Sequence, residues 1–277
     1  MVDGLKPVMR LRLRKTANGT EEIPILRLTE ESGSHLDDIV ARETPVTIVF
    51  NNQEMVTLLS SPKDLNYLAV GFLFSEGLVK NKEDIKKLMV DKQKGVVRVE
   101  TNKDTEQASE LIFKRIITSG CGRGASFYSA ADIELAQVES RIKISVPNIL
   151  SLIHAFQHRS EVYRATGGVH SAALCDNRSI LVFNEDIGRH NAIDKILGEC
   201  LLKDITTNDR VVLTSGRISS EILLKIAKRN IPLIVSKSAP TDLGVKLADD
   251  LGITLLGFVR GKRMNVYTHD WRIVTDD

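Results

Sequence analysis

Cysteines, aromatic residues and long apolar runs are all scarce in this sequence. Only three of its 277 residues are cysteines. An odd, small number of cysteines in a chain this long argues against a disulfide framework and indicates a reducing compartment. The longest apolar run, "YLAVGFLF", is far shorter than the roughly 20 residues that span a bilayer. The stretch "MVDGLKPVMRLRLRK" lacks the apolar segment of a secretory signal. We therefore expect a cytoplasmic protein that does not enter a membrane.

Other absences exclude classes of binding protein. The formal net charge is only +2, which argues against a protein dedicated to nucleic acid. The sequence has neither a Walker A nor a GxGxxG motif, so it predicts no ordinary triphosphate or dinucleotide site. Structural zinc needs clustered ligand pairs, and zinc deaminases need a His-x-Glu pair. Here Ser-Ala follows His170, and Cys175 stands alone. We predict no metal site.

The first half of the chain has the patterns of strands around one strong helix. Residues 44–60 contain two β-rich runs separated by Asn51-Asn52. They predict a hairpin, because asparagine tolerates positive φ. Ser61 is then expected to cap a helix, with Pro62 in its first position and Gly77 at its end.

The pattern changes near residue 145. A helix that opens at Pro147 is expected to continue until Gly167. Beyond it, the apolar strands "RVVLTSG", "IPLIVSKS" and "ITLLGFV" alternate with two amphipathic helices. This alternation is typical of βαβ units and predicts a parallel sheet covered on both faces. We expect a smaller N-terminal α+β domain over residues 1–145 and an α/β domain over residues 146–277.

Basic residues lie at the ends of all three strands, and glycines lie at the ends of the first and third. In such sheets, ligands bind beyond the carboxyl ends of the strands. A helix N-terminus there favours an anion, and glycine lets the backbone approach a ligand closely. The residues at these ends are Ser215, Gly216, Arg217, Lys237, Arg260, Gly261, Lys262 and Arg263. They predict a pocket for a phosphorylated ligand of the nucleotide kind, and the alternative is that the basic side chains are simply solvated.

The stretch "IITSGCGRGAS" places Cys121 between two glycines, with Arg115 and Arg123 nearby. Neighbouring cations lower the pKa of a thiol and favour the nucleophilic thiolate. A redox dithiol of the Cys-x-x-Cys type is excluded because the fourth position is Gly124. We predict that Cys121 is a lone nucleophile; the alternative is an incidental loop cysteine.

The other two cysteines have a different context. Cys200 falls on the apolar stripe of an expected helix that begins near Gly188, so it is predicted to be a core residue. Cys175 closes a strand beside a turn and is also expected to be structural.

Two histidines lie in the densest polar stretch of the sequence. His190 is one turn from Asp186 and one turn from Asp194, so both carboxylates could face it, which would either favour its imidazolium form or fix its tautomer. His170 follows a glycine pair that would leave room for a ligand. An ordinary hydrogen-bonded histidine is an equally open interpretation of each.

Several motifs resemble those of one family, the FdhD sulfur carriers that assist formate dehydrogenase, and they occur in the same order as in that family. The matching stretches cover residues 44 to 270 with gaps and are "SPKDLNYLAVGFLFSEGLV", "GCGRG", "TGGVHSAAL", "NEDIGRHNAIDKILG", "LTSGRISSEILLKIAK" and "LLGFVRGKRMNVYTH". The resemblance implies a cytidine deaminase-like three-layer α/β/α domain with an added smaller domain, and a homodimer. It implies a cysteine desulfurase as sulfur donor and formate dehydrogenase as client.

The resemblance also implies roles for particular residues. Cys121 would carry the sulfur as a persulfide and pass it to the molybdenum cofactor, a bis(molybdopterin guanine dinucleotide). The run Phe258, Val259, Arg260, Gly261, Lys262 and Arg263 matches the family's cofactor-binding segment. We add Ser215, Gly216, Arg217, His170 and His190 to the expected cofactor site. Gly124 departs from the many members that have a second loop cysteine there.

Two other functions remain open at this point. One is a nucleotide-acting hydrolase with a deaminase-like pocket and His170 or His190 as its base. The other is a chaperone that holds the cofactor without chemistry, which predicts that Cys121→Ser leaves client activation unchanged.

Overall fold

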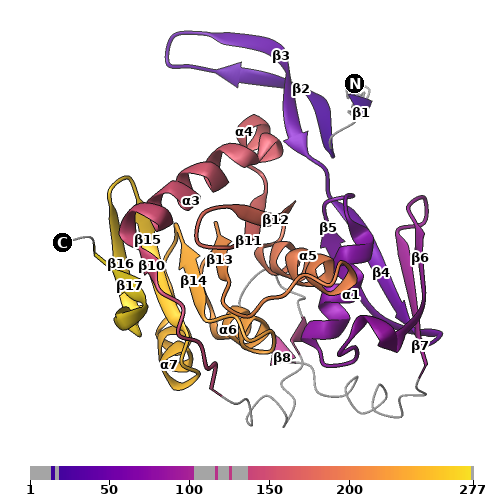
Figure 1. The fold of residues 1–277 in the computed structure, drawn as a ribbon. Coiled ribbons are helices and arrows are strands. Elements are labelled where there is room, and N and C mark those ends of the chain that lie inside the picture. The colour runs from indigo at the N-terminus through magenta and orange to yellow at the C-terminus, as the bar shows by residue number, and fades with distance from the viewer. Residues whose placement is uncertain (1–13, 16–18, 103–115, 118–124, 127–136, 276–277) are drawn as a thin grey trace, which may run out of the picture.

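The computed structural model describes residues 14–15, 19–102, 116–117, 125–126 and 137–275. The fold has a long hairpin arm, a four-stranded sheet and a six-stranded sheet, with helices packed against the two larger sheets (Figure 1). No helix among them is both long enough and apolar enough to cross a membrane.

The arm consists of β1 (Arg14–Lys15), β2 (Thr20–Leu28) and β3 (Gly33–Ala41). β2 and β3 are antiparallel and stay in register from Thr20↔Ala41 to Leu28↔Gly33. The arm extends away from the two larger sheets (Figure 1). This arm is not among the elements predicted from the sequence.

The predicted hairpin forms two strands of the smaller sheet and is confirmed. Asn51 and Asn52 have φ values of 44° and 66° and make the turn. The sheet order is β5-β4-β7-β6. Its strands are β4 (Thr44–Phe50), β5 (Gln53–Ser60), β6 (Ile85–Asp91) and β7 (Val96–Thr101).

Helix α1 (Leu65–Ser75) covers this sheet, and Gly77 with φ 77° follows its end as predicted. The predicted start of the helix is wrong. The N-cap is Asp64, whose side chain makes no capping hydrogen bond. Ser61 instead bonds the end of a distant strand, because its backbone N–H donates to Asp186 Oδ2 at 3.1 Å and its Oγ accepts from Ile187 N at 3.2 Å.

The larger sheet has the order β12-β11-β13-β14-β15-β16. The predicted parallel unit β13–β14–β15 is confirmed. β11 is antiparallel to both of its neighbours and β16 is antiparallel to β15, so the sheet as a whole is mixed. The strands are β11 (His170–Cys175), β12 (Ile180–Asp186), β13 (Val211–Thr214), β14 (Leu233–Ser236), β15 (Thr254–Arg260) and β16 (Arg263–Thr268).

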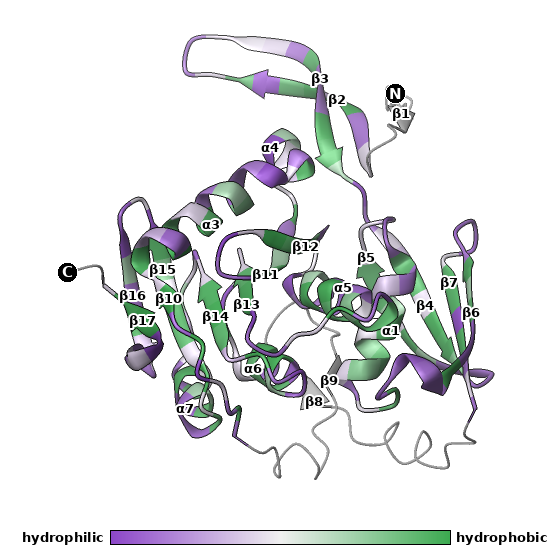
Figure 2. Ribbon diagram, in the orientation of Figure 1, coloured by the Kyte–Doolittle hydropathy of each residue, from purple (hydrophilic) through white to green (hydrophobic). Residues whose placement is uncertain are grey.

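Alternate residues of these strands belong to two separate cores, one on each face. Leu174, Val212 and Ile234 pack with α5 (Arg189–Leu202), α6 (Ser220–Ala227) and α7 (Asp242–Asp250). Cys175, Val211 and Leu213 pack with α3 (Val146–Arg159) on the other face. The central strands are accordingly among the most hydrophobic parts of the ribbon (Figure 2). Coverage on both faces, as predicted, gives a three-layer arrangement.

The helix predicted from Pro147 to Gly167 is in fact two helices, α3 and α4 (Glu161–Thr166). Ser160 separates them with extended backbone, and its Oγ caps α4 by accepting from Tyr163 N at 3.0 Å. The same hydroxyl donates to Glu185 Oε2 on β12. This bond across the fold explains the break, which the local pattern does not signal.

Helices α1 and α5 join the two sheets by an unusually close contact. A Cβ atom on Gly71 would lie 1.8 Å from the carbonyl oxygen of Asp194, and one on Gly198 would lie 2.0 Å from that of Tyr67. Only glycine allows such an approach. Leu201 at the end of α5 packs into the core of the smaller sheet. The division of the chain at residue 145 stays a prediction.

Short elements complete the described structure. β10 (Ile144–Ser145) pairs with β17 (Ile273–Val274) in parallel, and β8 (Ile116–Ile117) pairs with β9 (Ala125–Ser126). Two 3-10 helices, η1 (Lys82–Asp84) and η3 (Asp270–Arg272), lie next to β6 and β17 in sequence.

Candidate functional site

One edge of the larger sheet gathers nearly all of the predicted ligand-binding residues. β12, β13, β14 and β15 run in the same direction and end there, whereas β11 and β16 begin there. We call it the carboxyl edge. It is the edge at which α/β sheets of this kind bind ligands.

His170 and Ser215 meet at this edge although 45 residues separate them. Because β11 is antiparallel to β13, the first residue of β11 lies beside the end of β13. His170 Nδ1 lies 3.2 Å from Ser215 Oγ, and that oxygen also accepts from Ser171 N at 3.0 Å. Burial and the charge of Arg189 lower the pKa of His170, against an opposing effect of Asp186. The imidazole is thereby biased towards its neutral form.

The predicted partners of His190 are wrong. Its Nε2 lies 3.3 Å from Glu221 Oε2 on α6. Asp186 pairs instead with Lys195 at 2.6 Å, and Asp194 pairs with Lys225 at 2.6 Å. Each aspartate is therefore already neutralised by a lysine from the core.

The first of the two effects predicted for His190, a larger imidazolium fraction, is also wrong. Burial, with the charges of Lys225, Arg189 and His170, lowers the pKa of His190 to about 3. The carboxylate of Glu221 acts in the opposite direction, but desolvation and the nearby cations outweigh it. His190 is neutral near pH 7, so it can offer hydrogen bonds but not a positive charge.

Hydrogen bonds from side chains to backbone carbonyls connect the ends of the three parallel strands. Ser236 Oγ donates to the carbonyl of Gly216 at 2.7 Å. Arg260 Nε donates to the carbonyl of Lys237 at 3.2 Å. Partial burial, and secondarily the charge of Arg260, lower the pKa of Lys237. The structure thus brings Lys237 and Arg260 together, as predicted from their places after neighbouring strands.

The basic run after β15 forms the tip of a hairpin. Arg260 pairs with Arg263 in register, and Gly261 makes the turn with φ 59°. The side chains of Lys262 and Arg263 are exposed, as is that of Arg217 after β13. These cations are therefore free to meet an anion from solvent.

Phe258 and Val259 have opposite environments within this run. Phe258 has φ 53°, which is rare for a bulky residue. It lies in an irregularity of β15, where its N–H donates to Ser238 O at 3.1 Å and the residue is 37% exposed. Val259 is fully buried in the core beneath α3. A ligand could meet the side chain of Phe258, but only the backbone of Val259.

Gly216 and Arg189 are in close contact at the carboxyl edge. A Cβ atom on Gly216 would lie 2.8 Å from Arg189 Cβ. Arg189, His190 and Glu221 come from the starts of α5 and α6, beside Ser215 and His170. Arg189 and Glu221 were not predicted as site residues, because nothing in their local sequence marks them.

The two cysteines in the described chain are not nucleophiles. Cys175 and Cys200 are fully buried, and burial raises the pKa of each thiol to about 12. The structural roles predicted for them are confirmed. Cys121, the predicted nucleophile, lies outside the described residues. In the part of the chain that is described, no three His, Cys, Asp or Glu residues are placed to hold a metal ion.

Comparison with known proteins defines the family. The FdhD/NarQ family model matches residues 41–274. The chain belongs to the FdhD/NarQ family. The predicted family resemblance is therefore confirmed.

The FdhD/NarQ relatives match over most of their lengths. A sulfur carrier protein FdhD from Bacillus pumilus is 44% identical over 237 residues, which cover 85% of this chain and 90% of the relative. One from Staphylococcus aureus is 41% identical over 255 residues, covering 92% and 96%. A crystal structure of a protein assigned as a formate dehydrogenase accessory protein, from Desulfotalea psychrophila, matches with a TM-score of 0.77 and 30% identity over 92% of this chain and 99% of that one.

Proposed function

We propose that this protein is a sulfur carrier that serves a formate dehydrogenase. It accepts sulfur from a cysteine desulfurase as a Cys121 persulfide and passes it to bis(molybdopterin guanine dinucleotide) molybdenum before that cofactor enters its enzyme. The names of the relatives support the sulfur carrier role. One observation supports the rest of the proposal: three strand ends form one cationic edge. Hydrogen bonds from Ser236 to Gly216 and from Arg260 to Lys237 connect them.

The first step is a thiol exchange. The Cys121 thiolate attacks the outer sulfur of the desulfurase persulfide, the sulfur–sulfur bond of that persulfide breaks, and the desulfurase cysteine leaves as a thiolate. Cys121 then carries the outer sulfur as a persulfide. Since Cys175 and Cys200 are buried and protonated at neutral pH, neither competes for the sulfur.

The second step is delivery of that sulfur to the bound cofactor, which is the substrate here. Reduction of the outer persulfide sulfur to sulfide takes two electrons, which come from the metal centre itself or from a thiol reductant. The carboxyl edge would hold the phosphates through Arg217, Lys237, Arg260, Lys262 and Arg263. Neutral His170 and His190 would offer hydrogen bonds to the ligand rather than charge.

The proposal includes a cytidine deaminase-like architecture, a homodimer and a cytoplasmic location. The three-layer α/β/α arrangement supports the first of these. The neutral, buried state of His190 does not favour the hydrolase alternative, because a histidine with a pKa of about 3 is a weak base at neutral pH.

One experiment tests the sulfur carrier function. The purified protein is incubated with a cysteine desulfurase and cysteine, digested without reductant, and examined by peptide mass analysis. We expect one added sulfur on the Cys121 peptide, and none on that peptide in Cys121→Ala. Sulfur on Cys175 or Cys200 with Cys121 unmodified would contradict the assignment. Full client activation by a folded Cys121→Ser variant would favour the chaperone alternative.

A further inference from the structure

A cavity of about 580 Å³ lies at the opposite edge of the larger sheet from the candidate site. It is open to solvent, and three parts of the chain line it, namely the segment before β10, the turn between β11 and β12, and the residues just before β13. Its volume is in the range of small-ligand sites. Its lining residues are Arg141, Ile142, Lys143, Asp176, Asn177, Arg178, Asp209 and Arg210.

The two carboxylates of the cavity are already occupied by local donors. Asp176 accepts from the backbone N–H groups of Arg178 and Ser179, each at 2.7 Å. It also accepts from Ser179 Oγ at 3.0 Å. Asp209 accepts from Ser140 Oγ at 2.5 Å. These donors are uncharged, so both acids keep their negative charge, and Arg210 acts electrostatically on Asp176.

The four basic residues retain unused hydrogen-bond donors. Within the described part of the chain, the side chains of Arg141, Lys143 and Arg178 make no hydrogen bond or ion pair. Nε of Arg210 is buried and has no hydrogen-bond partner among the described residues. Since the lining holds four basic side chains and two carboxylates, the cavity has an excess of positive charge.

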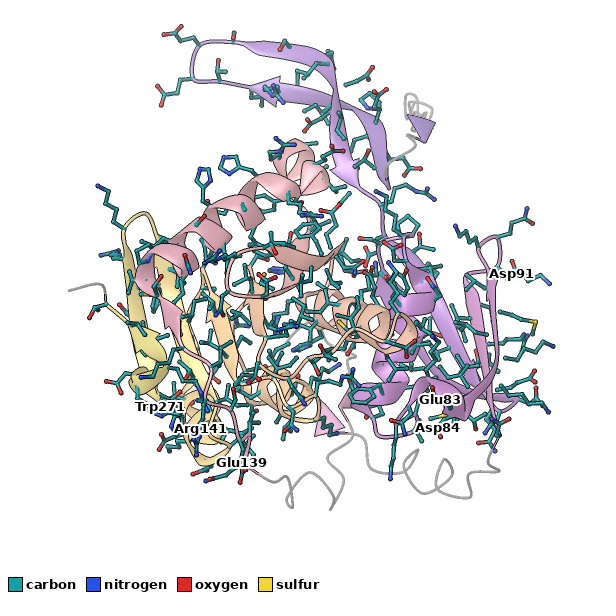
Figure 3. All side chains as sticks on the ribbon, viewed as in Figure 1. Glu83, Asp84, Asp91, Glu139, Arg141 and Trp271 are labelled. Atoms are coloured by element: carbon teal, nitrogen blue, oxygen red, sulfur yellow. The ribbon has the colours of Figure 1, made fainter. Side chains whose placement is uncertain are left out.

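The backbone around these cations is held in place. Asn177 Nδ2 donates to the carbonyl of Lys143 at 3.3 Å, which links the turn to the segment before β10. Arg272, only 2% exposed, donates from Nε and NH2 to the carbonyl of Ser140 at 3.3 and 3.2 Å. Arg141 lies in the lower part of Figure 3, between the labels of Trp271 and Glu139. The bases of the side chains are thus fixed, while their charged ends stay available.

We propose that this cavity binds a compact phosphorylated anion, at a site separate from the carboxyl edge. The planar guanidinium fork matches phosphate oxygens in a bidentate manner, and three of the four cations are arginines. Ile142 is the one apolar side chain in the lining, which contains no aromatic ring among the described residues. This lining suits a phosphate or pyrophosphate group better than a nucleobase, which needs an apolar or aromatic surface.

Calorimetric titration with inorganic pyrophosphate at low salt tests this site. The carboxyl edge also attracts anions, so the starting protein is the double variant Arg260→Ala/Arg263→Ala. Adding Arg141→Ala/Arg178→Ala should weaken pyrophosphate binding at least tenfold. Adding Lys86→Ala/Arg98→Ala, which removes the same charge from exposed positions on the smaller sheet, should leave the affinity within twofold.

Three outcomes would overturn the proposal. The first is that the starting protein does not bind pyrophosphate, and the second is that both pairs of substitutions weaken binding equally. The third is that the cavity binds an acidic peptide but does not bind pyrophosphate. Equal thermal unfolding midpoints of the variants exclude loss of fold as the cause. Sulfur acceptance by Cys121 is measured separately, so failure of this proposal is distinguishable from failure of the sulfur carrier function.

Discussion

Lys195 Nζ lies 2.6 Å from Asp186 Oδ2, and both side chains are completely buried. The same carboxylate oxygen accepts from Ser60 Oγ at 2.6 Å and from Ser61 N at 3.1 Å. One buried ion pair of the larger sheet therefore also bonds the end of β5 in the smaller sheet. Asp194 repeats this arrangement, because it binds both Lys225 and Ser75 of α1.

Removing one partner of the Asp186–Lys195 pair should destabilise the protein strongly. Asp186→Ala leaves a buried lysine without its counter-charge, and such changes cost about 3–5 kcal/mol. Urea unfolding measures the loss. The exposed Lys82–Asp204 pair supplies the control, because Lys82→Ala should cost at most about 1 kcal/mol. Equal losses of unfolding free energy in the two variants would show that the buried pair contributes no more to stability than the exposed pair.

The contact between α1 and α5 should depend on the absence of a side chain at Gly71. In Gly71→Ala the new methyl would lie 1.8 Å from the carbonyl oxygen of Asp194, so the helices must move apart. We expect a loss of about 3 kcal/mol or more in the free energy of unfolding. Gly77→Ala is the control, because it has φ 77° but no atom within 4 Å. It should cost about 1 kcal/mol. If Gly77→Ala is the more damaging change, the close contact is not the cause.

Cys175 and Cys200 should resist alkylation in the folded protein. Their pKa values of about 12 leave almost no thiolate at neutral pH, and both are buried. With iodoacetamide at pH 7.5 we expect the Cys121 peptide to be modified first, and the other two at a rate set by local opening. In urea all three should react. Rapid modification of Cys175 in the native state would contradict its burial.

The stability of the protein should fall as the pH decreases below about 6.5, in part because of His190. The unfolded chain takes up a proton near the ordinary histidine value, whereas folded His190 does so only near pH 3. Between these values the unfolded state binds more protons, so the free energy of unfolding rises with pH. Lowered protonation of His170 acts in the same direction.

Urea unfolding of wild type and His190→Gln between pH 4 and 8 measures the contribution of His190. The variant should have a shallower slope below pH 6.5 and a parallel curve above pH 7.5. Identical slopes below pH 6.5 would mean that His190 takes up its proton equally in the folded and unfolded states.

Guanine nucleotides should bind at the carboxyl edge if it holds the cofactor. Arg260→Ala/Arg263→Ala should weaken binding of guanosine diphosphate without unfolding the protein, since exposed charges contribute little stability. The affinity of the wild type should fall as salt rises, because cations supply much of the attraction. Lys86→Ala/Arg98→Ala is the charge-matched control. Equal affinities for the two double variants would place the nucleotide elsewhere.

Local patterns in the sequence were sufficient to predict several parts of the fold. The Asn51-Asn52 turn, the alternation of strands and helices from β13 to β15, and the burial of Cys200 were all predicted correctly. Each depends on residues that are near one another in the chain, such as turn formers or the apolar stripe of a helix. The convergence of Lys237 and Arg260 also followed, because parallel strands place their ends at one edge.

Other features depend on partners that are far away in the chain and were decided only by tertiary structure. Ser61 caps no helix because its Oγ instead accepts from the backbone N–H of Ile187, 126 residues later, while its own N–H donates to Asp186. His190 faces Glu221 because both of the nearer aspartates are bound to buried lysines. The cavity beside Arg210 exists because three separate segments meet there, namely the residues before β10, the turn between β11 and β12, and the residues before β13. The sequence by itself thus determined the elements and the chemistry offered at their ends, whereas the pairing of buried charges followed from which elements the fold brings into contact.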